Sequence, residues 1–136
     1  IDFLLSERKR IAGLYDTYLK DIKFLKLPAA GKDYIHSYQS YVCLFEPEKI
    51  NENNIDMIFN QRNDLMKKLD DAWIMTSQGT HSAAHQGYYK KKYSYSTADC
   101  FNSLVAEKCS IALPLFPGLS DEDVSYIASK LRTNNL

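Results

Sequence analysis

The chain has 136 residues, 45% of them apolar and 12% aromatic, and its 17 basic residues balance 17 acidic ones. This length fits one domain, and the apolar content is enough for a core, which excludes wholesale disorder. The zero net charge argues against a protein that binds nucleic acid through many phosphate contacts. No apolar run approaches the roughly 18 residues of a membrane-spanning helix, so we expect no membrane partner.

A predicted amphipathic helix over residues 6–22 opens the chain, because its apolar residues recur at three- and four-residue steps. Its basic residues, Arg8 to Arg10, are interpreted as surface charge. Pro28 and the small residues after it predict a connector. Residues 34–45 form the clearest predicted strand. Because apolar or aromatic groups occupy both of its faces, we expect this strand to be central in its sheet or covered on both sides.

Tyr38, Gln39 and Ser40 interrupt the apolar pattern of that strand. They fit ordinary strand positions with satisfied polar groups. They also fit polar side chains that a rigid strand presents to a site. The sequence leaves both interpretations open.

A second amphipathic helix is predicted over residues 55–71, after candidate N-caps in an asparagine-rich turn. A short strand over residues 73–76 then leads into a glycine-, histidine- and tyrosine-rich segment, residues 79–89. This segment, the histidine loop, has no apolar periodicity of its own. Loops of that kind, held by a packed scaffold, often carry function.

Thr97 is a candidate cap for a third helix, which precedes a predicted strand over residues 110–113. Ser120 and Asp123 resemble a capping box at the start of the last helix. The tail from Arg132 is expected to fray. The order of elements predicts an α+β fold: a small, mostly antiparallel sheet of three strands with helices packed on it.

Three cysteines, Cys43, Cys100 and Cys109, are odd in number and form no CxxC pair. This usage favours reduced thiols and a cytoplasmic protein over a disulfide framework. Cys43 and Cys109 are expected to behave as small buried apolar side chains.

The histidine loop contains no complete metal-binding motif. His81 and His85 could share a zinc ion on one helical turn, but no glutamate stands between them and no nearby carboxylate or cysteine completes the ligands, so we expect no metal site.

Lysines 90–92 lie among tyrosines, a mixture that can bind single-stranded nucleic acid. In a neutral protein they are better explained as a solvated face, so no nucleic-acid partner is expected.

Four motifs, in order, resemble those of the DegT/DnrJ/EryC1/StrS family of sugar aminotransferases. They are RKRIAGLY (residues 8–15), HSYQSYV (36–42), GTHSAAHQGYY (79–89), and SIALPLFPGL with the following DEDV (110–119 and 121–124). Together they extend over most of the chain and are much more specific than any one alone.

The resemblance implies that residues 1–136 are the C-terminal small domain of a pyridoxal 5′-phosphate (PLP)-dependent transferase of the aspartate aminotransferase-like fold. The N-terminal domain with the cofactor-bearing lysine would lie outside the chain, so this piece alone would be inactive. The implied reaction transfers an amino group, usually from glutamate, to a nucleotide-linked keto sugar. The implied setting is cell-surface polysaccharide, lipopolysaccharide or amino-sugar biosynthesis, and the implied assembly is a homodimer.

The resemblance also implies site residues, all of them binding rather than catalytic. His81 and His85 match the family's loop histidines and would donate to anionic oxygens of cofactor, amino donor or sugar nucleotide. Tyr38, Gln39 and Ser40 would flank the same cleft, and Tyr88 would close over the sugar.

The clustered lysines 90–92 do not suit a Schiff base, which needs a desolvated or charge-tuned lysine. A domain separated from its partner should also expose apolar surface. The alternative hypothesis is a non-catalytic sugar-nucleotide-binding or regulatory module with the same fold.

Overall fold

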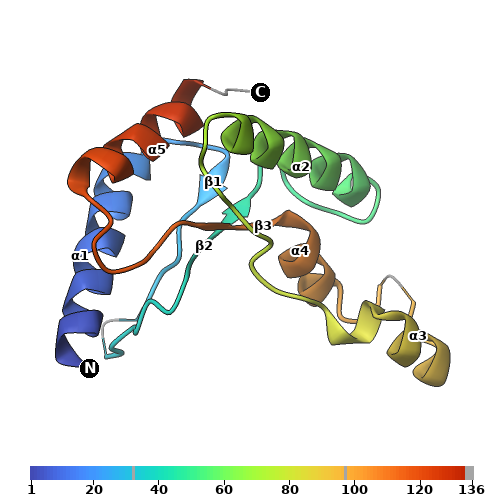
Figure 1. Ribbon diagram of the computed structural model, residues 1–136. Coiled ribbons are helices and arrows are strands. Elements are labelled where there is room, and N and C mark those ends of the chain that lie inside the picture. Colours follow the sequence, from blue (N-terminus) through green and yellow to red (C-terminus); the bar gives the residue numbers. More distant parts are fainter. Residues whose placement is uncertain (32, 97, 134–136) are drawn as a thin grey trace.

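The computed structural model describes residues 1–31, 33–96 and 98–133. Within these ranges the elements are, in chain order, α1 (Asp2–Leu19), β1 (Leu25–Lys26), β2 (Tyr41–Phe45), α2 (Ile55–Asp71), the 3-10 helix η1 (Ala83–His85), α3 (Gly87–Tyr93), α4 (Phe101–Cys109), β3 (Ser110–Leu113) and α5 (Asp121–Thr133). Figure 1 shows α1 beside α5 on one side of the strands and α2 beside α4 on the other. The proposed cap Thr97 and the tail residues 134–136 lie outside the described residues. No described helix is long and apolar enough to cross a membrane.

The three strands form one antiparallel sheet with β2 in the middle, in the order β1-β2-β3. Tyr41 at the start of β2 pairs with Leu113 at the end of β3, so these two strand ends lie at the same end of the sheet. The predicted α+β class and the central place of β2 are confirmed. So are the predicted bounds of α2 and β3.

The predicted strand over residues 34–45 was wrong in extent, and the predicted strand over residues 73–76 was wrong altogether. Residues 34–40 are irregular, and Tyr38 has φ 46°, a left-handed conformation that cannot continue a strand. Trp73 has φ 61° at the turn that ends α2, and of the segment after it only Ser77 pairs with the sheet, through one bridge to Ala112. The third strand is instead β1, whose 2 residues are too few to show an alternating pattern.

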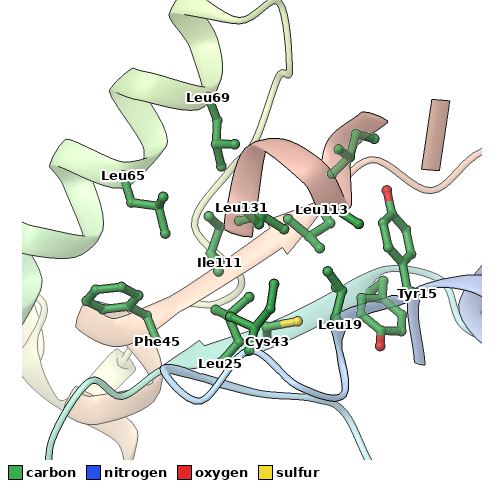
Figure 2. Close-up of a cluster of buried hydrophobic side chains, with 14 of the residues drawn as sticks. Tyr15, Leu19, Leu25, Cys43, Phe45, Leu65, Leu69, Ile111, Leu113 and Leu131 are labelled. Carbon is green, nitrogen blue, oxygen red and sulfur yellow. The ribbon is translucent and has the colours of Figure 1, made fainter. Parts of the chain in front are cut away.

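One face of the sheet carries the core. Tyr41, Cys43 and Phe45 alternate along β2 as fully buried side chains, and the Tyr41 ring lies 4.8 Å from the ring of Tyr15 on α1. Figure 2 shows side chains of β1, β2 and β3 meeting those of α1, α2 and α5 in one cluster. Its labelled members are Tyr15, Leu19, Leu25, Cys43, Phe45, Leu65, Leu69, Ile111, Leu113 and Leu131.

The opposite face of the sheet is less well covered. Val42 and Leu44, which alternate with the core residues of β2, are only half-buried, as is Ala112 on β3. We call this the open face. It is the face on which a site or a second body of protein can lie.

Polar contacts fix α1 against the start of α5. Arg10 pairs with Glu7 and Asp121 and donates to the Leu119 carbonyl at 2.9 Å, so this arginine links two elements in addition to carrying surface charge. The predicted capping box is confirmed, because the Asp123 N–H donates to Ser120 Oγ at 3.0 Å and the Ser120 N–H donates to Asp123 Oδ2 at 3.3 Å. The α5 residues expected to face inward are all buried: Val124, Ile127, Ala128 and Leu131.

Arg62 on α2 is 2% exposed, and no carboxylate in the described parts of the chain pairs with it. Its guanidinium contacts Met66 Sδ at 3.2 Å and the Phe59 ring at 5.1 Å, and its buried Nε has no hydrogen-bond partner there. Burial lowers the pKa of this guanidinium. Because a buried, unpaired charge is costly, Arg62→Met should raise the free energy of unfolding by about 1–2 kcal/mol. Urea denaturation measures this change, and a less stable variant would contradict it.

Candidate functional site

The histidine loop is attached to the open face at its first residue. Ser77 and Ala112 exchange backbone hydrogen bonds of 3.2 and 2.7 Å, and the Gly79 N–H donates to Ser110 Oγ at 3.0 Å. A Cβ atom on Gly79 would lie 2.4 Å from Val42 Cγ1 and 2.8 Å from Ser110 Oγ. Only glycine fits this close approach, so the loop starts from a fixed point on the sheet.

A hollow of about 290 Å³ lies beside this attachment, at the end of the sheet where β2 begins and β3 ends. Gln39 and Ser40 line it together with Thr76 and Ser77, which lead into the histidine loop. Its apolar lining comes from Met75 and from Ala112, Leu113, Pro114 and Leu115. The hollow therefore brings two of the sequence-predicted site residues next to the loop, with polar groups from two segments.

Tyr38 is separated from Gln39 and Ser40 by its left-handed backbone. Its ring lies 4.3 Å from the ring of His36 and 6.4 Å from that of Tyr41, and its N–H donates to His36 Nδ1 at 2.9 Å. Tyr38 thus packs at the margin of the core and is not among the residues that line the hollow.

The second half of the loop is tied to α4 through Ser82, which is fully buried. Its N–H donates to the Glu107 carboxylate, its hydroxyl accepts from the Ser103 hydroxyl at 2.9 Å, and its Oγ lies 2.7 Å from His85 Nδ1. Gln86 also donates to Glu107, at 3.0 Å. His85 Nε2 is buried and has no hydrogen-bond partner in the described residues.

His81 is placed differently from His85. It is exposed, and its Nδ1 lies 3.0 Å from Nε2 of Gln78, which also donates to the Thr80 carbonyl at 2.7 Å. Tyr88 is 66% exposed on α3, a helix without buried residues, and its ring lies edge-on to that of Tyr89. The structure thus spreads the predicted site residues over the hollow, the loop and α3.

Comparison with known proteins identifies the fold and the family. The profile of the DegT/DnrJ/EryC1/StrS aminotransferase family matches residues 1–132. The chain belongs to this family. The spore coat polysaccharide biosynthesis protein SpsC of Bacillus subtilis is 29% identical to it over 132 residues, which are 97% of this chain and 32% of SpsC.

Two solved structures of the family's fold align with nearly all of the chain. Spr1654 from Streptococcus pneumoniae is described as a candidate sugar aminotransferase in a PMP form, and it aligns with a TM-score of 0.78 at 23% identity. The alignment covers 96% of this chain and 30% of the Spr1654 chain. DesV of S. venezuelae aligns with a TM-score of 0.80 at 15% identity, and the alignment covers 99% of this chain and 33% of the DesV chain. The chain spans about a third of the length of the relatives that it matches.

Reasoning from the sequence missed several polar residues around the histidine loop. Ser103 and Glu107 lie four residues apart on α4, a spacing that places them on one helix face, and this signal could have been read. Gln78, immediately before the loop, gives no such signal, because its partner is recognisable only from the folded loop.

The parts of the chain that the structure describes contain no cluster of three or more histidine, cysteine or carboxylate side chains able to hold a metal ion.

The cysteines should differ sharply in reactivity. Burial raises the pKa of the Cys43 thiol to about 12 and that of Cys109 to about 11, whereas Cys100 is exposed. Because the thiolate is the reactive form, a raised pKa means less reaction near pH 8. We expect a thiol reagent to label Cys100 alone in the folded protein and all three cysteines in denaturant. Rapid labelling of Cys43 in the folded protein would contradict the structure.

Proposed function

We propose that this chain is the C-terminal small domain of a PLP-dependent sugar aminotransferase. The parent protein would transfer an amino group from glutamate to a nucleotide-linked keto sugar in cell-surface polysaccharide or amino-sugar biosynthesis. The observation that carries the proposal is the family match over residues 1–132. SpsC, a spore coat polysaccharide biosynthesis protein, supports the pathway class, and solved PLP and PMP forms of Spr1654 support the cofactor.

In this proposal the chain's own residues bind and orient the ligands. The hollow lined by Gln39 and Ser40 offers amide and hydroxyl groups for a sugar, and the adjacent loop offers the imidazole of His81 for an anionic group. Tyr88 on α3 offers an exposed ring to the same ligand. The hollow lies at the end of the sheet, next to the point where the loop is attached to the open face, so a second domain placed there would enclose a cleft.

The side chains of this chain fit a supporting role toward PLP. A lysine that carries the cofactor needs a desolvated or charge-tuned setting, and none of the lysines in residues 1–31, 33–96 and 98–133 is buried. Lysines 90–92 in particular are exposed at the end of α3. Bound PLP would act as the electron sink of the reaction, and its covalent attachment point would be a lysine of the other domain.

An exposed apolar surface supports the two-domain proposal. Trp73 is 96% exposed and Met75 82% exposed, and with Phe116 and Tyr126 they surround a hollow of about 620 Å³ between the end of α2 and α5. The backbone of Trp73 is left-handed, which is unfavourable for a bulky residue, and its side chain is exposed to solvent. An apolar surface of this kind marks a contact with another body of protein.

The isolated 136-residue chain should therefore self-associate, and Trp73→Gln with Met75→Gln should reduce that association. Sedimentation velocity at increasing concentration measures the effect. The double substitution Glu52→Gln and Asn53→Gln, at two exposed positions of the turn before α2, serves as the control and should leave the association in place. A sharply monomeric unsubstituted chain at high concentration would count against the docking role of this surface.

The function itself is tested on the full-length protein purified with PLP. Glutamate added without a keto sugar should reduce the visible absorbance and release a stoichiometric amount of 2-oxoglutarate. A nucleotide-linked keto sugar added next should restore the absorbance. A protein that binds no PLP would overturn the aminotransferase proposal, and release of keto acid only from another amino acid would overturn the choice of donor.

A further inference from the structure

The side chain of Gln78 determines which ring nitrogen of His81 carries the proton. Gln78 Nε2 lies 2.7 Å from the Thr80 carbonyl oxygen, which can only accept, so the group at this end of the amide is the NH₂. The same nitrogen lies 3.0 Å from His81 Nδ1. An amide NH₂ only donates, so Nδ1 must accept. In the neutral imidazole the proton is then on Nε2, which becomes a hydrogen-bond donor.

His85 is placed differently. Its Nδ1 lies 2.7 Å from Ser82 Oγ, which also accepts from the Ser103 hydroxyl at 2.9 Å. The other ring nitrogen of His85, Nε2, is buried, and Ser82 is fully buried beside α4. The contacts of His85 hold the loop together rather than presenting a ring nitrogen to solvent.

His81 lies between two fixed points of the chain. Gly79, two residues before it, is bound to Ser110 on β3, and Ser82, the next residue, is bound to Glu107 on α4. The backbone of His81 is thus held from both sides, and Gln78 holds the ring. A donor fixed in this way loses little conformational freedom when it binds a ligand.

We propose that the two loop histidines have separate roles, with Gln78 as the positioning residue. Gln78 holds His81 as an exposed Nε2–H donor to an anionic oxygen of the ligand, whereas His85 contacts Ser82, the residue through which the loop is bound to α4. This inference rests on the proposed function, in which the anionic oxygen belongs to the diphosphate of the sugar nucleotide or to the carboxylate of the amino donor.

The test uses the full-length protein with its cofactor, labelled with ¹⁵N-histidine and studied by NMR. His81→Gln and His85→Gln assign the two rings. His81 should show a protonated Nε2 and an unprotonated Nδ1. Pyrophosphate and glutamate are then added separately, and saturation by one of them should shift the His81 signals and leave those of His85 in place. A response to pyrophosphate assigns the oxygen to a diphosphate, and a response to glutamate assigns it to a carboxylate.

Gln78→Glu is the decisive variant, because it keeps the size of the side chain and replaces the NH₂ donor by a carboxylate that only accepts. It should move the His81 proton to Nδ1 and weaken binding of the active probe by at least about tenfold, the effect of losing one charge-assisted hydrogen bond. Asn102→Asp adds the same charge at an exposed position of α4 and should leave the His81 signals unchanged.

Three results would overturn the inference: a wild-type His81 protonated on Nδ1, an unchanged tautomer in Gln78→Glu, or probes that shift His85 or neither histidine. The tautomers are measured without any reaction. Their failure therefore leaves the aminotransferase proposal standing, and a protein without transaminase activity leaves the tautomer result readable.

Discussion

Gly79→Ala is expected to lower the free energy of unfolding by roughly 2–3 kcal/mol, the upper part of the range for overpacked sites. The added Cβ would lie 2.4 Å from Val42 Cγ1 and 3.0 Å from Ser110 Cβ. Both neighbours are on strands of the sheet, and the β-branched Val42 side chain has few alternative rotamers. The loop must therefore move away from the sheet, which also breaks the bond from the Gly79 N–H to Ser110.

Gly13→Ala is the matched control for this substitution. Gly13 lies inside α1, and a Cβ there meets no atom within 4 Å. Because alanine favours the helix over glycine, Gly13→Ala should raise the free energy of unfolding by about 0.5–1 kcal/mol. Urea denaturation of both variants provides the comparison. Equal stability of Gly79→Ala and wild type would show that the loop does not lie against the sheet.

His81→Ala in the full-length protein should lower kcat/KM about 10- to 100-fold for the substrate whose anionic oxygen His81 binds, the nucleotide sugar or the amino donor, as expected for a lost hydrogen bond to a charged group. The melting temperature should be unchanged, because the His81 side chain is exposed. Steady-state kinetics and thermal denaturation of the same preparation measure the two effects.

His85→Ala, in contrast to His81→Ala, should affect mainly the stability of the protein. It removes a hydrogen-bond partner of the buried Ser82 hydroxyl, so the melting temperature should fall. A His81→Ala variant with normal kinetics, or a His85→Ala variant of normal stability, would contradict the division of roles between the two histidines.

Elements with strong periodicity were predictable from the sequence. The apolar residues of α2 and the inner residues of α5 repeat at helical spacing, and the capping box at Ser120 marks the start of α5. The wrong strand predictions lie where the φ angle of a single residue determines whether a strand can form. Tyr38 and Trp73 have positive φ values that sequence patterns assign to glycine or asparagine, so the irregular segments beside them were predicted as strands.

The candidate site was predictable only in part. The ordered motifs located the histidine loop and the family, since their residues are adjacent in sequence. The contacts of Ser82 with Ser103 and Glu107 join segments 21 and 25 residues apart, and no local pattern encodes them. The difference between His81 and His85 likewise arises from their neighbours in the folded chain.

The central claim, that this chain is the supporting domain of a PLP enzyme, is tested most directly by borohydride reduction of the full-length protein with bound PLP, followed by peptide mapping. The account predicts a pyridoxyl group on one lysine outside residues 1–136 and none on lysines 90–92. A pyridoxyl group on a lysine within residues 1–136, or no covalently attached cofactor at all, would contradict it.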